Sequence, residues 1–211
     1  MTGDPASLRT SPISNAIRSR RLIAVLRRIE PRDRLTTLVA DLVADGIAIL
    51  EITLDAGGAA ADLAAVRAEL GDAAVVGAGT IRTRAQLDAA IDAGAAFGVS
   101  PVLDPAILAA ALAAGFPFIP GTYTPTEADS AWRSGATFVK LFPGSSLGPS
   151  HVREMRGPLP EIESIVSGGV DASNAAAFLA AGAVAVGIGS ALTRLTRAER
   201  RALVLALEPA R

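Results

Sequence analysis

Eight short apolar runs recur along the chain at the spacing of one strand-plus-helix unit, and this repeat limits the possible folds. They cover residues 22–26, 47–54, 74–78, 96–99, 117–120, 137–142, 164–167 and 184–188. The runs are typical of strands buried on both faces, as parallel strands are. Eight such units in 211 residues predict an α/β fold, a single (β/α)8 TIM barrel spanning residues 1–211. A doubly wound open sheet is the alternative.

Segments rich in alanine and leucine, with the periodicity of helices, separate the predicted strands. A glycine ends many of them just before the next strand, where a left-handed residue is favoured. These glycines are Gly46, Gly94, Gly115, Gly135 and Gly182. Residues 7–20 predict an extra N-terminal helix, which we expect to cover the bottom of the barrel.

Composition excludes several classes of function. The net charge is -1 and basic residues form no long run, which argues against nucleic acid as a partner. No apolar stretch reaches the length of a membrane span, and residues 1–12 have no apolar signal core, so we expect a cytoplasmic protein. Cysteine is absent and His151 is the only histidine, so thiolate chemistry is excluded and no metal site or cofactor is expected.

Lys140 interrupts an apolar run, residues 136–144, that is predicted to be a buried strand. Lysine is seldom buried without a partner because desolvating an ammonium group is costly. One interpretation is that Lys140 sits at the strand end and extends its charged end into solvent. The other is that the lysine has a chemical role, and the remaining strand ends bear on that choice.

Polar residues follow most of the predicted strands, at the end of the barrel where active sites form. They include Arg27, Glu51, Thr53, Thr80, Ser100, Lys140, Ser167 and Ser190. Strand alternation places Glu51 and Thr53 on one face and Ile52 and Leu54 on the other. Alternatives without chemistry remain: a buried salt bridge from Glu51 to Arg27 or Lys140, and backbone capping by the threonines.

Two glycine-containing turns, Ser167-Gly168-Gly169 and Gly189-Ser190, follow the last two strands. Loops at this place in barrels often bind phosphate, because glycine lets backbone N–H groups approach the anion. Ordinary turn chemistry is the alternative. The two turns therefore predict a phosphorylated small-molecule substrate.

Burial among apolar residues would lower the pKa of Lys140, and Arg27 would add to this if it faces the same cavity. A neutral amine can attack a carbonyl group and form a Schiff base, whose iminium serves as an electron sink for C–C chemistry. Glu51 is the one strand-end carboxylate of suitable parity, so it is the candidate proton shuttle.

These residues form an ordered set of motifs: Glu51-Ile-Thr-Leu54, Gly77-Ala-Gly-Thr80, Ser100-Pro101, Pro120-Gly121, Val139-Lys-Leu-Phe-Pro143 and Ser167-Gly-Gly-Val170. The set resembles the 2-keto-3-deoxy-6-phosphogluconate aldolase family, the KDPG/KHG aldolases, from about Leu22 to Leu192. The resemblance implies a cofactor-free homotrimeric aldolase that cleaves this substrate to pyruvate and glyceraldehyde 3-phosphate through a Schiff base.

By matching position, the resemblance makes Lys140 the Schiff-base lysine and Glu51 the general acid/base. Arg27, Thr80 and Pro101 match positions that contact substrate, and Thr53 is a further candidate on the face of Glu51. The phosphate end corresponds to Ser167, Gly168, Gly169, Gly189 and Ser190.

Two positions depart from the family pattern. Asp55 stands where several members carry an arginine that helps hold the pyruvate carboxylate, and Ser167 stands where threonine is usual. Carboxylate binding would then fall to Arg27, Thr80 and backbone N–H groups. Other activities stay open: cleavage of the galactonate epimer or of 4-hydroxy-2-oxoglutarate, or a phosphate-binding barrel without C–C chemistry.

Overall fold

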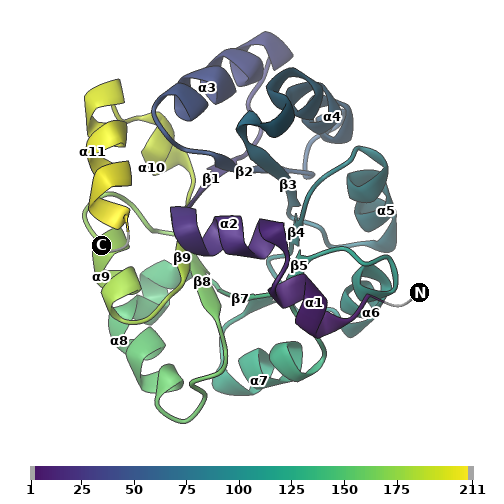
Figure 1. Ribbon diagram of the computed structural model, residues 1–211, viewed down its shortest axis with the longest axis vertical. Coiled ribbons are helices and arrows are strands. Elements are labelled where there is room, and N and C mark those ends of the chain that lie inside the picture. Colours follow the sequence, from purple (N-terminus) through teal and green to yellow (C-terminus); the bar gives the residue numbers. More distant parts are fainter. Residues whose placement is uncertain (1–2, 209–211) are drawn as a thin grey trace.

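Parallel strands form a nearly closed barrel inside a ring of helices (Figure 1). The structure is a computed structural model, and it describes residues 3–208. The strands are β1 (Leu22–Leu26), β2 (Ile49–Thr53), β3 (Val75–Gly79), β4 (Gly98–Val99), β5 (Phe118–Ile119), β6 (Gly121–Thr122), β7 (Val139–Leu141), β8 (Ser164–Ser167) and β9 (Ala185–Ile188).

The helices are α1 (Pro5–Arg9), α2 (Pro12–Arg20), α3 (Arg32–Ala44), α4 (Ala59–Leu70), α5 (Arg84–Asp92), α6 (Pro105–Ala113), α7 (Pro125–Arg133), α8 (Gly144–Arg156), α9 (Ala175–Ala180), α10 (Ser190–Thr193) and α11 (Arg197–Leu207). A short 3-10 helix, η1 (Gly71–Ala73), follows α4, and non-helical backbone at Gly148 interrupts α8. None of the helices within residues 3–208 is long and apolar enough to cross a membrane.

The first and last strands, β1 and β9, pair with each other, and every pairing is parallel. The two ends of the sheet are β5 and β6, which are consecutive in the chain, so the barrel is nearly closed. The (β/α)8 barrel expected from the sequence is therefore confirmed. The predicted fifth strand differs, because it is divided into β5 and β6 by Pro120. Proline has no N–H group to donate to the ladder, although its carbonyl still accepts from the Lys140 N–H at 2.9 Å.

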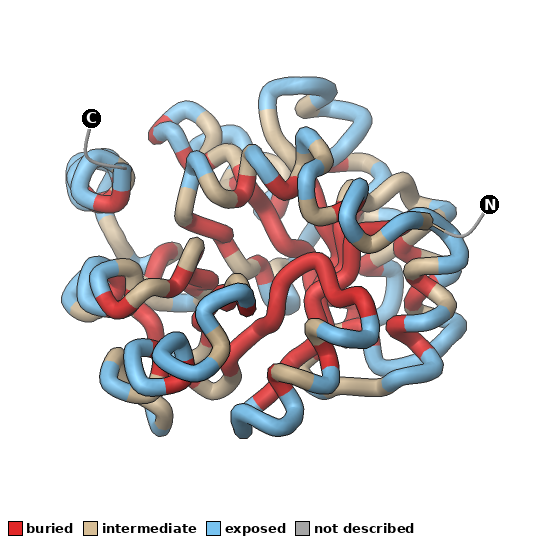
Figure 2. Tube along the Cα trace, turned by 60° about the horizontal axis from the view of Figure 1, so that its bottom comes forward, coloured by how far each residue is buried: buried red, intermediate tan, exposed pale blue. Residues whose placement is uncertain are grey.

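Two apolar layers result from the alternation of side chains along each strand. The outer layer lies between strands and helices and contains Leu50 and Ile52 of β2. The inner cluster fills the barrel and contains Ile49, Phe97 and Phe138. Figure 2 shows the buried strands at the centre and the exposed surfaces of the helices outside.

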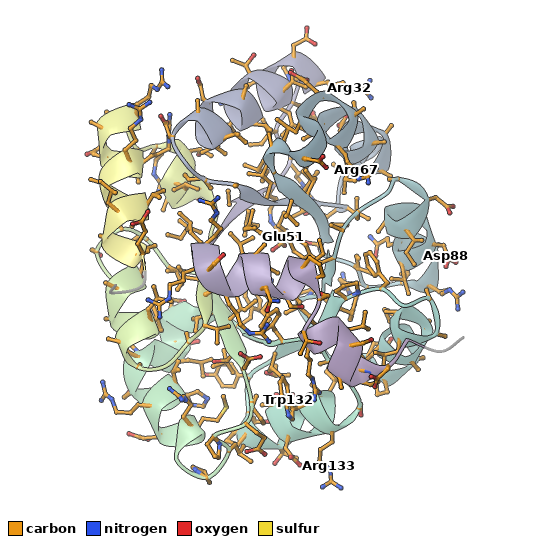
Figure 3. The ribbon with its side chains drawn as sticks, viewed as in Figure 1. Arg32, Glu51, Arg67, Asp88, Trp132 and Arg133 are labelled. Atoms are coloured by element: carbon orange, nitrogen blue, oxygen red, sulfur yellow. The ribbon has the colours of Figure 1, made fainter. Side chains whose placement is uncertain are left out.

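The same alternation directs Glu51 of β2 and Lys140 of β7 toward the barrel axis. Each lies two residues from a member of the inner cluster, Ile49 and Phe138, and both line a cavity with Ile23 and Ile165. Figure 3 shows Glu51 near the centre of the ring of helices. The predicted parity of β2 is thus confirmed.

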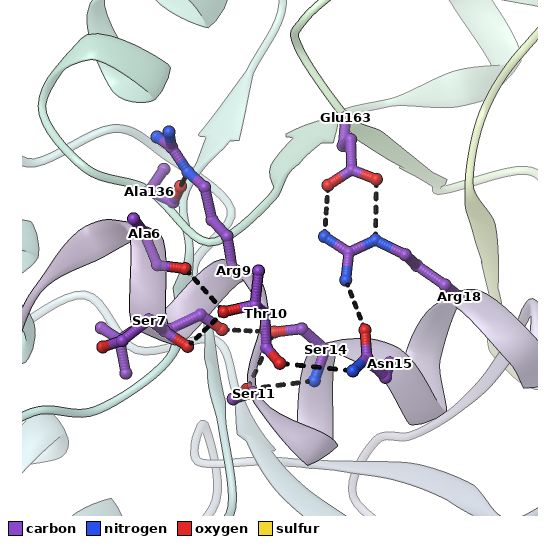
Figure 4. Close-up of polar contacts among 11 residues, drawn as sticks. Ala6, Ser7, Arg9, Thr10, Ser11, Ser14, Asn15, Arg18, Ala136 and Glu163 are labelled. Atoms are coloured by element: carbon purple, nitrogen blue, oxygen red, sulfur yellow. Dashed lines mark hydrogen bonds and ion pairs between the residues drawn. The ribbon is translucent and has the colours of Figure 1, made fainter.

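The N-terminal segment covers one end of the barrel, as expected, but as two helices rather than one over residues 7–20. Ser11 caps a new helix through the Ser14 N–H, with Pro12 at its first position, and this divides α1 from α2. Ile17 of α2 is buried in the inner cluster. Arg18 holds α2 to the barrel by two hydrogen bonds to Glu163, one of 2.7 Å from its Nε (Figure 4).

The predicted helix ends are confirmed. All five glycines proposed to end helices, Gly46, Gly94, Gly115, Gly135 and Gly182, have positive φ angles. These ends lie at the covered face of the barrel, away from the carboxyl ends of the strands where the polar residues gather.

Candidate active site

Lys140 lies inside the barrel, with 6% of its surface exposed. Its Nζ atom is 4.9 Å from the centroid of the Phe142 ring. Burial lowers the pKa of Lys140; the nearby Glu51 charge opposes this effect and the Arg27 charge adds to it. The interpretation of Lys140 as a strand-end charge in solvent is therefore wrong, and the neutral amine is favoured relative to an exposed lysine.

Glu51 is equally enclosed, with 3% of its surface exposed. Burial raises the pKa of its carboxyl group, and the positive charges of Lys140 and Arg27 oppose this. Its side chain passes directly over Gly79 of β3, where any Cβ atom would overlap the carboxyl oxygen Oε1. A residue without a side chain at position 79 is therefore a condition for this placement of Glu51.

A narrow cavity inside the barrel connects the two groups. It is lined by Ile23, Glu51, Val99, Ile119, Lys140, Ile165, Ser167 and Gly187. Within the described chain, Glu51 forms a salt bridge with neither Lys140 nor Arg27, so the purely structural ion pair considered from the sequence is not observed. A buried amine and a buried carboxyl group facing one cavity have opposite pKa shifts, which suits proton transfer and nucleophilic attack.

An open cleft of about 430 Å³ continues from this cavity, since Lys140 and Ser167 line both. The cleft is lined by Val25, Arg27, Lys140, Phe142, Ser167, Gly168, Gly169, Val170, Asp171, Gly189, Ser190, Ala191 and Arg194. It therefore unites Lys140 with Arg27 and with all five residues predicted for a phosphate site.

The two glycine turns shape the far end of this cleft. Gly168 and Gly169 have φ angles of 85° and 77°, which other residues rarely adopt. Among the described residues, none accepts a hydrogen bond from the backbone N–H groups of Gly168, Gly169 or Ser190. These N–H groups are free to bind an anion in the cleft.

Arg27 and Thr80 also meet, at the rim of the barrel. Arg27 Nη2 donates to Thr80 Oγ1 at 3.2 Å, and Arg27 Nη1 lies 2.8 Å from Asp55 Oδ2. The same Asp55 oxygen is 3.3 Å from Arg28 Nε. Thr80 has a φ of 58°, an unusual value for a β-branched residue. Strain of this kind gathers at functional sites.

Three predicted substrate contacts lie outside the cleft: Thr80, whose hydroxyl accepts from Arg27 at the rim, and two wall residues. Thr53 is buried and its hydroxyl donates to the Leu26 carbonyl at 3.4 Å, which agrees with the backbone-capping interpretation. Pro101 packs through its carbonyl group against Gly121, so close that a Cβ atom at Gly121 would overlap it. Neither residue lines the space that holds Lys140.

Sequence reasoning missed three features of this site. Lys140 is the only lysine of the chain, which a residue count alone would have revealed. Gly79 leaves space for the Glu51 side chain, and its signal was a glycine near the carboxyl end of the strand next to that of Glu51. Arg194 lines the cleft although it lies beyond the last glycine motif and was not among the predicted site residues.

The fold and the site define the class of protein: a (β/α)8 barrel whose polar residues gather at the carboxyl ends of the strands, as in barrel enzymes. The family model for KDPG and KHG aldolase matches residues 13–203. The chain belongs to the KDPG/KHG aldolase family and is a lyase that acts on small molecules. The resemblance seen in its motifs is thus confirmed.

Among curated proteins, the chain is similar to a probable 2-dehydro-3-deoxy-6-phosphogalactonate aldolase of Rhizobium meliloti, with 36% identity over 82% of each chain. It is 34% identical to the 2-dehydro-3-deoxy-6-phosphogalactonate aldolase of Escherichia coli, over 85% of this chain and 88% of the relative. The solved 2-keto-3-deoxy-6-phosphogluconate aldolase of Zymomonas mobilis superposes with a TM-score of 0.83 at 26% identity, covering 94% of this chain and 97% of that one.

Proposed function

We propose that this protein is a Schiff-base aldolase that cleaves a 6-phosphorylated 2-keto-3-deoxy sugar acid to pyruvate and glyceraldehyde 3-phosphate. The observation that carries the proposal is the placement of Lys140 and Glu51 on one buried cavity, with the pKa of the amine lowered and that of the acid raised. The neutral amine and the nearby acid supply a nucleophile and a proton carrier.

The first half of the reaction forms the covalent intermediate. Neutral Lys140 Nζ attacks the C2 carbonyl carbon of the substrate, and the resulting carbinolamine takes up a proton from solvent and loses water to give an iminium ion. The Glu51 carboxylate then removes the proton of the C4 hydroxyl group. The C3–C4 bond breaks, its electron pair moves toward the iminium nitrogen, and glyceraldehyde 3-phosphate leaves an enamine of pyruvate.

The second half returns the enzyme to its starting state. Protonated Glu51 gives its proton to C3 of the enamine, which becomes the iminium of pyruvate. Water adds to C2, one proton returns to solvent, pyruvate leaves, and Lys140 is again a neutral amine. One water molecule is lost and one is gained, so the net reaction is cleavage alone.

The two ends of the substrate would be held by different parts of the cleft. Arg27 is suited to bind the carboxylate end of the substrate. Its guanidinium has five N–H donors, and hydrogen bonds to Asp55 and Thr80 use one each. Ser167, Ser190 and the free N–H groups of the glycine turns suit the phosphate end. Thr53 and Pro101 support the walls and are not assigned a substrate contact.

The configuration at C4 of the substrate is a separate choice, because both epimers yield the same two products. The motifs led us to expect the gluconate epimer, whereas the two curated relatives described above are named for the galactonate epimer. A relative named for the gluconate epimer is equally similar, with 34% identity over 82% of this chain, so identity does not choose between the two epimers. Comparing kcat/KM for the two epimers decides this point.

A homotrimer is part of the proposal. Large apolar side chains of Val102, Tyr123 and Leu205 are exposed, and exposed apolar surface often marks a contact between subunits. Light scattering should give three times the chain mass of 21.4 kDa. A monomer mass at micromolar concentration would remove this part of the proposal and leave the chemistry untouched.

The central experiment is borohydride reduction in the presence of pyruvate, followed by peptide mass mapping. Because Lys140 is the only lysine, one stable pyruvate adduct on its peptide is expected, and none when borohydride or pyruvate is omitted. If Lys140 remains unmodified while the protein still cleaves substrate, the Schiff-base mechanism is wrong. If pyruvate neither adds nor exchanges its protons, the protein is a phosphate-binding barrel without C–C chemistry.

A further inference from the structure

Three cationic side chains line the cleft, and two of them already have other interactions or roles. Arg27 donates hydrogen bonds to the side chains of Asp55 and Thr80 at the rim of the barrel. Lys140 is buried with a lowered pKa and faces Glu51 across the inner cavity. The third, Arg194, is exposed and forms no salt bridge with any residue between positions 3 and 208. It is therefore the cation of the cleft that has neither an ion pair nor a role assigned above.

A negative charge lies beside the glycine turns, and a cation in the cleft would offset it. Asp171 lines the same cleft, and hydrogen bonds from the Ser173 hydroxyl and backbone N–H lower the pKa of its carboxyl group. Its negative charge would repel a phosphate dianion held by the neighbouring Gly168 and Gly169. Backbone N–H groups carry only partial charges, and a guanidinium lining the same cleft would offset the charge of Asp171.

The backbone at Arg194 is well anchored although its side chain is exposed. Leu192, two residues earlier, is 1% exposed, and the Leu195 N–H donates to the Leu192 carbonyl at 3.2 Å. Arg200 Nη1 donates to the Leu195 carbonyl at 2.9 Å, while its Nη2 lies 2.7 Å from the buried Asp45. Segments on both sides of Arg194 are thus fixed, so binding a ligand would order its side chain without also having to order its backbone.

We infer that Arg194 binds the terminal phosphate of the substrate from the side of α10, and that this residue makes the enzyme discriminate in favour of a phosphorylated substrate. The inference rests on the proposed function for its substrate class. A guanidinium suits the task, because it can donate two parallel hydrogen bonds to phosphate oxygens. Arg194 lies outside the cavity of Lys140 and Glu51, so it has no part in the bond-breaking step.

The test compares Arg194→Gln and Arg194→Lys with the wild type, using the phosphorylated substrate and its unphosphorylated analogue. Arg194→Gln should raise KM for the phosphorylated substrate by about 10- to 100-fold, the usual worth of hydrogen bonds to a charged group, with kcat nearly unchanged. Its kcat/KM for the unphosphorylated analogue should stay within about twofold of wild type. Arg194→Lys should recover part of the loss, because it keeps the charge without the bidentate geometry.

Arg133→Gln is the matched control, since Arg133 is an exposed arginine on α7 that does not line the cleft (Figure 3). It should match wild type with both substrates. Equal losses with both substrates in Arg194→Gln, or no loss with either, would overturn the inference.

Two further measurements separate this inference from the proposed chemistry. Deuterium uptake into pyruvate involves no phosphate and should proceed at the wild-type rate in Arg194→Gln; absence of uptake in the wild type would instead reject the Schiff-base mechanism. Titration calorimetry with inorganic phosphate needs no turnover, and Arg194→Gln should bind phosphate at least about tenfold more weakly than wild type and Arg133→Gln. Equal phosphate affinity in all three proteins would contradict a phosphate contact by Arg194.

Discussion

The carboxyl group of Glu51 lies so close to the backbone of Gly79 that any Cβ atom at position 79 would overlap it. The two residues are on adjacent strands, with Gly79 two residues beyond the partner of Glu51 in the ladder, Gly77. The placement of the proposed acid/base thus depends on a residue that has no chemistry of its own.

Replacing Gly79 by alanine should therefore displace Glu51 without unfolding the barrel. We expect Gly79→Ala to slow deuterium uptake into pyruvate by roughly 10²-fold, since small errors of position are costly in catalysis. Gly57→Ala is the control, because a Cβ atom at Gly57 meets nothing within 4 Å. Uptake at the wild-type rate in Gly79→Ala, with unfolding unchanged, would show that Glu51 tolerates the displacement.

Lys140→Arg should abolish both substrate cleavage and pyruvate exchange. A guanidinium stays protonated at every working pH and cannot attack a carbonyl group. The variant has no lysine, so borohydride should leave its side chains unmodified in the presence of pyruvate. Circular dichroism should confirm that the barrel still folds. Exchange at the wild-type rate in Lys140→Arg would eliminate the Schiff-base mechanism.

Glu51→Gln should separate covalent binding from proton transfer. The amide has nearly the same shape as the carboxyl group but cannot carry a proton between substrate atoms. We expect pyruvate exchange to slow by roughly 10²–10⁴-fold, while borohydride still traps pyruvate on Lys140. NMR of the pyruvate methyl group measures the exchange. If trapping disappears together with exchange, Glu51 is needed for Schiff-base formation itself.

The pH dependence of trapping should report the titration of Lys140. Because burial lowers the pKa of Lys140 below the ordinary 10.5, the trapping rate at saturating pyruvate should rise with pH to a midpoint below that value. The Arg27 charge also disfavours the ammonium form, so Arg27→Gln should move the midpoint to higher pH. Arg28→Gln is the neighbouring control and should leave it in place. A midpoint unmoved by Arg27→Gln would show that Arg27 does not influence Lys140.

Asp45→Asn tests the attachment of the C-terminal helix rather than the site. The Asp45 side chain is fully buried between Arg197, Arg200 and Arg201, with Arg200 Nη2 at 2.7 Å. Removing its charge leaves buried Arg200 unpaired, which should cost roughly 3–5 kcal/mol and lower Tm by about 6–20 °C. The exposed Asp41, replaced by asparagine, is the control. A Tm within 2 °C of wild type in Asp45→Asn would mean that water or another group satisfies Arg200.

The stability of the folded protein should also depend on pH through the carboxyl group of Asp45. Burial opposes ionisation of Asp45, but hydrogen bonds from Arg200 and Arg197 outweigh it and hold the pKa of the carboxyl group below its ordinary 3.8. The stabilisation by Asp45 is therefore present above pH 3.8 and is lost as the pH falls through the folded value. Asp45→Asn should lack this loss, so its Tm should approach that of wild type at low pH.

Local patterns in the sequence were sufficient to predict the barrel and to select Glu51 and Lys140 as candidate site residues. Strand alternation is a property of a few consecutive residues, so the face shared by Glu51 and Thr53 followed from their neighbours, while burial was one of two interpretations of Lys140. The repeat of strand and helix implied a closed barrel, and closure brings strand ends to one rim. The gathering of Arg27 and the two glycine turns at one rim could therefore be predicted, and their common cleft was seen only in the structure.

Other features depend on contacts between segments far apart in the chain. The bond from Arg27 to Asp55 and Thr80, the space over Gly79 and the approach of Arg194 to the cleft arise only when the barrel closes. Thr53 and Pro101 have suitable positions in the sequence, yet hydrogen bonding and packing turn them into wall residues. Sequence determined which residues face inward, because side-chain direction is local; the tertiary structure decided which of them meet, because distances across the barrel depend on all strands together.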